Sequence, residues 1–209
     1  VAGGAHFREG RCAVTSAHHD ARFFDAFPPD IRRHTLLITL LREPAARTVS
    51  HFQMLRRFNI TAATLAASVE QYAVWDPRGV ARTKNKQARM VSGDFCCTNG
   101  TAIPYGSPAV LERAMQRMQD DFCVMGIMER MEETLSYLHF VLGVRHQPDG
   151  SGPGGVFGTG GARPLEPALA GTLRLANGLD VQLYDAAGVR FEAQMAAMRA
   201  AAGTGAGGA

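Results

Sequence analysis

The chain has 209 residues, of which 46% are hydrophobic and 20% are charged, so its composition suits one globular domain with a sizeable core. The net charge of +3 is too small to indicate nucleic-acid binding by itself. No apolar run reaches the roughly 18 to 20 residues that a membrane span requires. The cysteines, Cys12, Cys96, Cys97 and Cys123, lack the spacing of zinc ligands, which argues against a metal site.

The first regular element is expected after an irregular stretch over residues 1–30. Residues 35–41 form a short continuous apolar run with β-branched members, which is the pattern of a strand buried on both faces in a parallel sheet. Pro44 suits the first turn of a following helix. The apolar side chains of this helix recur on one face, so it should pack back on the sheet.

The middle of the chain predicts more helices and a second buried strand. Proline directly after Ser107 indicates a helix start, and Gly143 is a common residue at a helix end. The expected elements are helices over 61–73 and 80–92 separated by a break at 75–79, a helix from 107, a strand over 122–128 and a helix over 130–142.

The last quarter opens with a Gly/Pro-rich loop over 147–164 and continues as helix over 166–200 with a break at Asn177. Residues 201–209 are a low-complexity Ala/Gly tail that is expected to be disordered. Strands that alternate with helices predict one α/β domain over residues 1–200, a parallel β-sheet flanked by helices.

The most informative segment begins where the first strand ends. Arg42 follows this strand directly, at the edge where α/β folds bind ligands. Ser50 lies eight positions further on, about two helical turns into the next helix. A guanidinium and a hydroxyl so placed can bind one phosphate. An arginine at a strand edge and an exposed helix serine are the ordinary structural alternative.

This segment resembles the part of sulfotransferases that binds the 3′-phosphate of 3′-phosphoadenosine 5′-phosphosulfate (PAPS). That family has an apolar strand, Arg-Asp-Pro, and then Arg and Ser at the spacing of Arg47 and Ser50; Glu43 replaces the usual Asp. The resemblance implies that Arg42 and Ser50 are ligands of the 3′-phosphate. Arg47 is expected to be structural or adjacent to this site.

Further segments resemble motifs of heparan-sulfate sulfotransferases, in the same order along the chain. Residues 85–90 are similar to the Asn-x-Gln-x-Arg-Met helix, 122–130 to a strand and turn that end in Glu-Arg, and 179–185 to a Leu-Asp-x-x-Leu-Tyr-Asp helix typical of the 6-O-sulfotransferases. The resemblance implies a fold like that of P-loop nucleotide kinases. It also suggests that Arg89 contacts the donor or the substrate, although a basic residue on such a helix also fits a solvated face.

One part of the family's donor site is missing from residues 1–34. They contain no Lys-Thr-Gly-like loop to hold the 5′-phosphosulfate, and this loop is expected upstream of Val1. The chain alone is therefore expected to be inactive. By resemblance to a Gly-x-His element, His6 is the expected general base for the sugar hydroxyl, and the competing histidines are His18, His19 and His51.

The sequence therefore predicts a PAPS-dependent carbohydrate sulfotransferase that modifies an acidic polysaccharide, without a metal and without nucleic acid. The resemblance places it on the lumenal side of the Golgi membrane, with any membrane anchor outside this chain. The basic side chains expected to match the acidic substrate are Arg56, Arg57, Arg82, Lys84 and Lys86. The alternatives are an inactive sulfotransferase-like module that binds anionic glycans and a nucleotide kinase.

Overall fold

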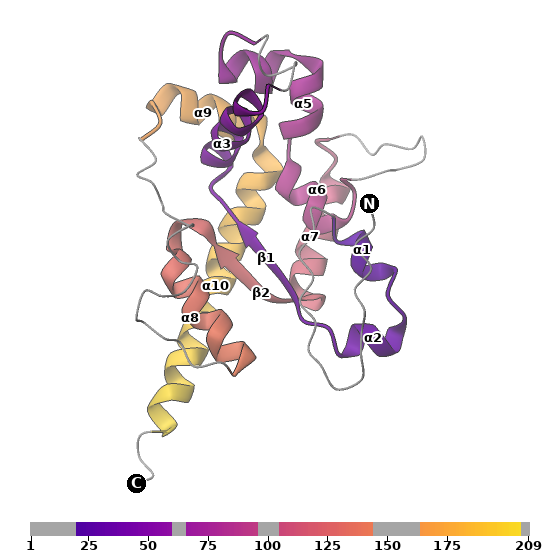
Figure 1. Cartoon of the computed structure of the whole chain (residues 1–209), viewed down its shortest axis with the longest axis vertical. Coiled ribbons are helices and arrows are strands. Elements are labelled where there is room, and N and C mark those ends of the chain that lie inside the picture. The colour runs from indigo at the N-terminus through magenta and orange to yellow at the C-terminus, as the bar shows by residue number, and fades with distance from the viewer. Residues whose placement is uncertain (1–19, 60–65, 96–104, 144–163, 206–209) are drawn as a thin grey trace.

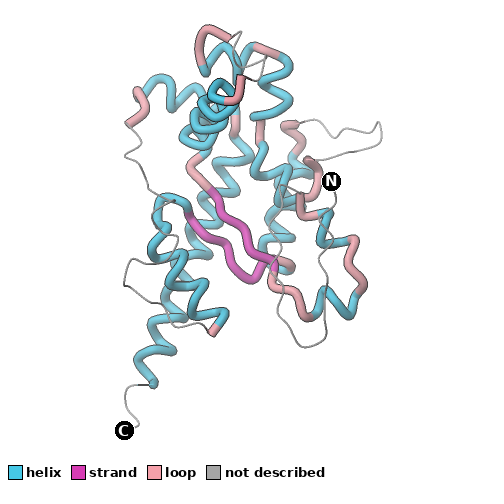
Figure 2. Tube along the Cα trace, viewed as in Figure 1, coloured by secondary structure: helices cyan, strands magenta, loops and turns pink. Residues whose placement is uncertain are grey.

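The computed structural model describes residues 20–59, 66–95, 105–143 and 164–205. Helices surround a small sheet of two strands, β1 (Leu37–Leu41) and β2 (Phe122–Ile127), as Figures 1 and 2 show. The strands are parallel, and their register runs from Leu37 opposite Phe122 to Leu41 opposite Ile127. The expectation of parallel strands flanked by helices is thus confirmed at this coarse level.

The helices have the following bounds. They are α1 (Arg22–Asp25), α2 (Pro29–Arg33), α3 (Pro44–Arg57), the π-helix η1 (Gln71–Trp75), α5 (Pro77–Thr83), α6 (Lys86–Ser92), α7 (Pro108–Asp120), the 3₁₀ turn η2 (Met128–Arg130), α8 (Met131–Leu142), α9 (Pro167–Ala176) and α10 (Gly178–Gly205).

Proline at the first helical position begins α3, α5, α7 and α9. A carboxylate caps three of these starts: Glu43 accepts from Ala46 N at 2.7 Å, and Asp76 and Glu166 accept from the first turns of α5 and α9. Ser107 precedes α7 as expected, but its side chain makes no capping hydrogen bond. Gly143 ends α8 with a φ of 63°, a conformation that glycine adopts without strain.

Strand β1 is not buried on both faces, contrary to the expectation. Leu41 is 2% exposed and packs in the core, but Ile38 and Leu40 on the opposite face are 37% and 41% exposed. The reason is that α8 packs on β2 on that side and leaves this face of β1 incompletely covered among the described residues.

Several helix boundaries also differ from the expectation. The helix expected over 80–92 is two helices, because Asn85 takes a φ of 48° and breaks the run. Helix α5 begins inside the break that was expected over 75–79. The described part of the helix expected over 61–73 ends in the π-helix η1. Helix α10 continues to Gly205, so the tail is helical over its first five residues rather than disordered from residue 201.

The buried side chains form two clusters. The larger joins both strands to α6, α7 and α10 through residues that include Leu41, Val110, Met125 and Phe191. The smaller joins α3, η1 and α9 through residues that include Phe52, Tyr72 and Leu173. Figure 1 shows α3, α5 and α9 together beyond the carboxyl end of β1. The β1–α3 junction therefore lies where the two clusters meet. No helix in the described ranges is both long enough and apolar enough to span a bilayer.

Candidate functional site

Arg42 lies directly after β1, and the side chain of Gln87 holds its backbone. Arg42 N donates to Gln87 Oε1 at 2.8 Å, and Gln87 Nε2 donates to Arg42 O at 2.9 Å. The segment with Arg42 and the helix with Gln87 are two of the motifs that the sequence singled out, and they are in direct contact. The side chain of Arg42 is half-buried at the strand end and forms no ion pair or hydrogen bond with the other described residues.

The other two motifs meet at the next residue, Glu43. Glu43 N donates to Glu129 Oε1 at 2.9 Å, and Tyr184 Oη donates to Glu129 Oε2 at 2.9 Å. The carboxylate of Glu43 pairs with Arg174 Nε at 2.8 Å. Hydrogen bonds to Arg174 and to the start of α3 lower the pKa of Glu43, although burial acts in the opposite direction. All four motif segments are therefore joined beyond the carboxyl end of β1.

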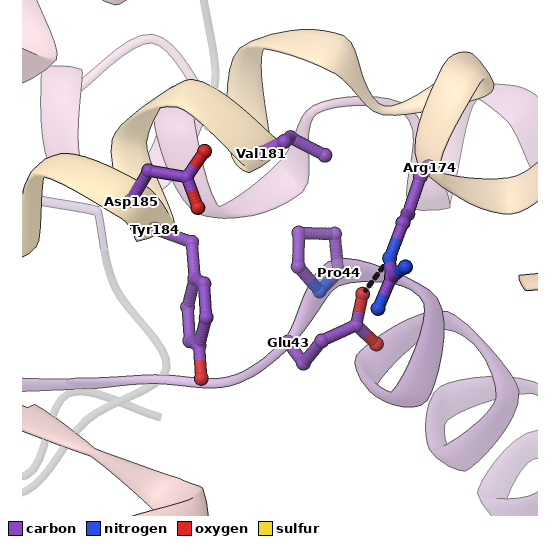
Figure 3. Close-up of a pocket in the computed structure, with 6 residues that line it drawn as sticks. All are labelled: Glu43, Pro44, Arg174, Val181, Tyr184 and Asp185. Carbon is purple, nitrogen blue, oxygen red and sulfur yellow. Dashed lines mark hydrogen bonds and ion pairs between the residues drawn. The ribbon is translucent and has the colours of Figure 1, made fainter. Parts of the chain in front are cut away.

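A small pocket of about 230 Å³ lies beside this junction (Figure 3). The ion pair of Glu43 and Arg174 forms one wall, and Tyr184 and Asp185 from α10 form another. A second pocket of about 300 Å³ shares Glu43 and Arg174 and extends toward Glu129. The motif residues Glu43, Glu129 and Tyr184 thus line one or both of these pockets. The contacts around the junction also hold α3, α9 and α10 together.

The starts of α6 and α10 stabilise each other. The carboxylate of Asp180 accepts from Gln87 N at 3.2 Å and from Ala88 N at 2.7 Å. In return, Asn85 Oδ1 accepts from Leu179 N at 3.0 Å, and Asn85 N donates to Asn177 Oδ1 at 2.9 Å. Burial raises the pKa of Asp180, against the lowering effect of Arg47 and of these backbone bonds. The two motifs over 85–90 and 179–185 thus each contain a polar side chain, Asn85 or Asp180, that caps the helix of the other motif.

Ser50 and Arg89 occupy different surroundings. Ser50 is half-buried on α3, about two turns beyond Arg42 and one turn beyond Arg47. Arg89 is 7% exposed, donates to Ala81 O at 3.0 Å and lies over the ring of Tyr105 at 4.2 Å. Arg89 therefore does not belong to a solvated face. Its contact with the donor stays a prediction.

Residues of α3, η1, α5 and the start of α6 form a basic cluster whose members act on one another electrostatically. We name it the α3 cluster and define it as Arg47, His51, Tyr72, Arg82 and Lys86. Arg47 Nη2 donates to Thr83 O at 2.8 Å. Burial and the charges of Lys86, Arg47 and Arg82 lower the pKa of His51 to about 4, so its imidazole is neutral at pH 7. Burial and the neighbouring arginines lower the pKa of Lys86 to about 8. Burial is the larger cause of both pKa shifts, and the neighbouring positive charges add to it.

Sequence reasoning singled out Arg42, Ser50 and Arg89 as contacts to the donor or substrate, and these roles stay predictions. It expected Arg47 to be structural or adjacent to the phosphate site, and it named His51 as a competing general base. It missed Tyr72, because no spacing rule relates η1 to α3, and it missed Gln87 as the side chain that holds Arg42. The spacing of Arg47 and His51 by four positions on one helix face was the signal that could have indicated the α3 cluster.

Several predicted residues lie outside the described part of the chain. These are His6, His18, His19, Cys12, Cys96 and Cys97, together with residues 147–163 of the expected loop over 147–164. Cys123 is exposed and is not in a disulfide. Within residues 20–59, 66–95, 105–143 and 164–205, no three His, Cys, Asp or Glu side chains gather as metal ligands would. Comparison of the chain with protein-family models, with curated proteins and with solved structures finds no match.

Proposed function

We propose that this chain is part of a sulfotransferase that moves a sulfonyl group from PAPS to a sugar hydroxyl of an acidic polysaccharide, in the manner of heparan-sulfate 6-O-sulfotransferases. The observation that carries the proposal is the junction beyond β1. There Gln87 fixes the backbone of Arg42, and Glu129 binds both Glu43 N and Tyr184. Segments chosen for their resemblance to one family would have no reason to meet at one strand end if that resemblance were accidental.

The charge at this edge supports a donor with phosphate groups. Arg42 presents a guanidinium at the carboxyl end of a parallel strand, and Ser50 follows on α3. In the proposal these two side chains bind the 3′-phosphate, because charge-assisted hydrogen bonds are the strong ones. The fold proposed to hold them is that of P-loop nucleotide kinases, with a Lys-Thr-Gly-like loop for the 5′-phosphosulfate. Arg89 is the third proposed contact to the donor or substrate.

The proposed reaction is an in-line displacement at sulfur. The sugar oxygen forms a bond to sulfur while the bond from sulfur to the phosphate oxygen breaks, and 3′-phosphoadenosine 5′-phosphate (PAP) leaves with the electron pair. A general base takes the proton of the sugar hydroxyl, and His6 is proposed for this role. Basic side chains stabilise the charge on the transferring group. A Golgi location is part of the same proposal.

Calorimetry with PAP tests the donor site in a protein that includes the donor loop. Arg42→Ala should weaken PAP binding at least tenfold, and more than Ser50→Ala, because hydrogen bonds to charged groups contribute about 1.5–3 kcal/mol. Adenosine 5′-phosphate, which lacks the 3′-phosphate, should respond little to either change. Equal losses for both nucleotides would contradict the assignment of Arg42 and Ser50.

The same basic surface also fits a module that binds anionic glycans without turnover. A transfer assay separates the two functions, with PAPS and a heparan-type acceptor, in a protein that includes the donor loop. Sulfonyl transfer that Arg42→Ala abolishes supports the enzyme. Glycan binding without PAP binding supports the module, and phosphoryl transfer from ATP to a nucleotide would favour the kinase.

A further inference from the structure

Three buried polar atoms in the α3 cluster have no hydrogen-bond partner among the described residues. They are Nε of Arg47, Nδ1 of His51 and Oη of Tyr72. Arg47 and His51 lie one turn apart on α3, and the ring of Phe52 packs on Tyr72 with centroids 5.4 Å apart. Buried polar groups in folded proteins are almost always hydrogen-bonded. Three such atoms in one cluster therefore indicate that one bound group accepts hydrogen bonds from all of them.

The packing leaves these atoms little freedom to find protein partners. Helix α5 is pressed against η1 at Gly79, where an added Cβ would lie 1.8 Å from Tyr72 O. Thr83 of the same helix accepts from Arg47 through its carbonyl and donates its hydroxyl to Gly79 O at 2.8 Å. Helices α3 and α5 and η1 are thus fixed relative to one another around the unpaired atoms.

The charges of the cluster are unbalanced. Arg47, Arg82 and Lys86 form no ion pair within the described ranges. The carboxylates that act on the cluster are Asp180 and Asp76, and both already accept backbone hydrogen bonds at helix starts. Arg89 adds a further positive charge beside Lys86. Among the described residues, no carboxylate therefore forms an ion pair with Arg47, Arg82 or Lys86.

We propose that Arg47, His51 and Tyr72 bind one tetrahedral oxyanion, a phosphate or sulfate group, with Lys86 and Arg82 on its solvent side. The Nε–H of Arg47 and the O–H of Tyr72 donate to its oxygens, and His51 donates through Nδ1–H. Such an anion satisfies every unpaired atom and balances the charge, and several donors around one small anion suit its geometry. Arg82 is exposed and Lys86 half-buried, so the site opens to solvent on their side.

This site goes beyond the proposed function, because none of its three central residues is a proposed donor ligand. The anion has two possible sources, a nucleotide phosphate or a sulfate ester of an acidic glycan. Ser50 lies one turn from Arg47, so a nucleotide bound at Arg42 could reach the cluster. The test therefore uses inorganic anions first and then probes both sources.

Thermal unfolding of the whole chain at pH 7 tests the site, with sodium sulfate or phosphate compared against sodium chloride at equal ionic strength. Sulfate should raise the melting temperature in a saturating manner, because a ligand of the folded state stabilises it by mass action. Tyr72→Phe and Lys86→Met should each weaken the apparent affinity for sulfate about tenfold. Arg33→Met removes a positive charge from an exposed position on α2 and should bind sulfate like the wild type.

Melting temperatures in chloride distinguish a lost binding site from a destabilised fold. In chloride, Lys86→Met should melt at the wild-type temperature or above it, because it removes a half-buried cation that its neighbours repel. Sulfate should also raise the pKa of His51 from about 4, which NMR of the imidazole measures. A sulfate effect that does not saturate, or that is equal in Lys86→Met and Arg33→Met, would overturn the site.

The two sources separate with PAP and a sulfated heparin disaccharide as probes. If Lys86→Met reduces the stabilising effect of one probe more than Arg33→Met does, that probe supplies the anion. Arg42→Ala distinguishes this proposal from the proposed function, because it should keep the sulfate response while PAP binding is lost. In a protein that includes the donor loop, a sulfate response without PAP binding would support the anion site and contradict the donor site.

Discussion

Gln87 holds the backbone of Arg42 with two hydrogen bonds of opposite direction, one accepted at 2.8 Å and one donated at 2.9 Å. A primary amide is the side chain that can do both, because it carries an acceptor oxygen and a donor nitrogen. Gln87 is 8% exposed, so water does not easily replace these bonds. The position of the strand-end guanidinium therefore depends on a residue 45 positions away.

Replacement of Gln87 should impair both stability and nucleotide binding. Gln87→Leu leaves two backbone groups of Arg42 without partners, and each unsatisfied buried group costs about 1–3 kcal/mol. Urea unfolding should show this loss, and calorimetry should show weaker PAP binding. Gln182→Leu, at an exposed glutamine on α10, is the control and should change the free energy of unfolding by less than about 0.5 kcal/mol. Wild-type PAP affinity in Gln87→Leu would contradict a role in positioning Arg42.

Removal of Asp180 should also destabilise the chain. Its side chain is fully buried and caps the start of α6 by accepting from Gln87 N and Ala88 N. Asp180→Ala leaves these two buried N–H groups without their acceptor, and each unsatisfied buried group costs about 1–3 kcal/mol. Asp185→Ala, an exposed carboxylate on the same helix, is the control. Equal urea midpoints for the two variants would show that the reciprocal capping contributes little.

The general base is tested by kinetics in a protein that includes the donor loop. His6→Ala should lower the rate of sulfonyl transfer by roughly a hundred- to ten-thousand-fold. PAP affinity should hardly change, because the base faces the sugar hydroxyl. The wild-type rate should fall as the pH drops below about 6.5, the ordinary pKa of an imidazole. His51→Ala should affect anion binding first. Near-normal turnover in His6→Ala would remove His6 from the mechanism.

The elements that the sequence predicted well depend on a few consecutive residues. The apolar runs around Leu40 and Val124 gave both strands, and Pro44 and Pro108 marked helix starts. Patterns of this kind are local, because propensity and capping act within one or two turns. The strand-end position of Arg42 followed from the first strand in the same way.

The features that the sequence could not predict depend on long-range contacts. The break at Asn85 requires a positive φ, and the bonds that hold it reach Asn177 and the carbonyl of Tyr105. The approach of Tyr72 to Arg47 likewise depends on how η1 packs on α3, which no periodicity encodes. The exposed face of β1 differed from the expectation because burial depends on the neighbouring elements and not on the strand's own composition.

The stability of the folded chain at acidic pH should depend on His51. Its pKa is about 4 in the folded chain and 6.5 as an ordinary histidine, so between these values the unfolded chain binds a proton that the folded chain does not. Stability should therefore fall as the pH drops from 6.5 to 4, since it rises with pH wherever the unfolded state binds more protons. Urea midpoints at pH 7, 6, 5 and 4 in chloride measure this fall. His51→Gln cannot take up the proton, so it should lose less stability over that range, whereas His34→Gln, at an exposed histidine, should follow the wild type. Parallel curves for all three proteins would show that His51 is not held in its neutral form by the α3 cluster.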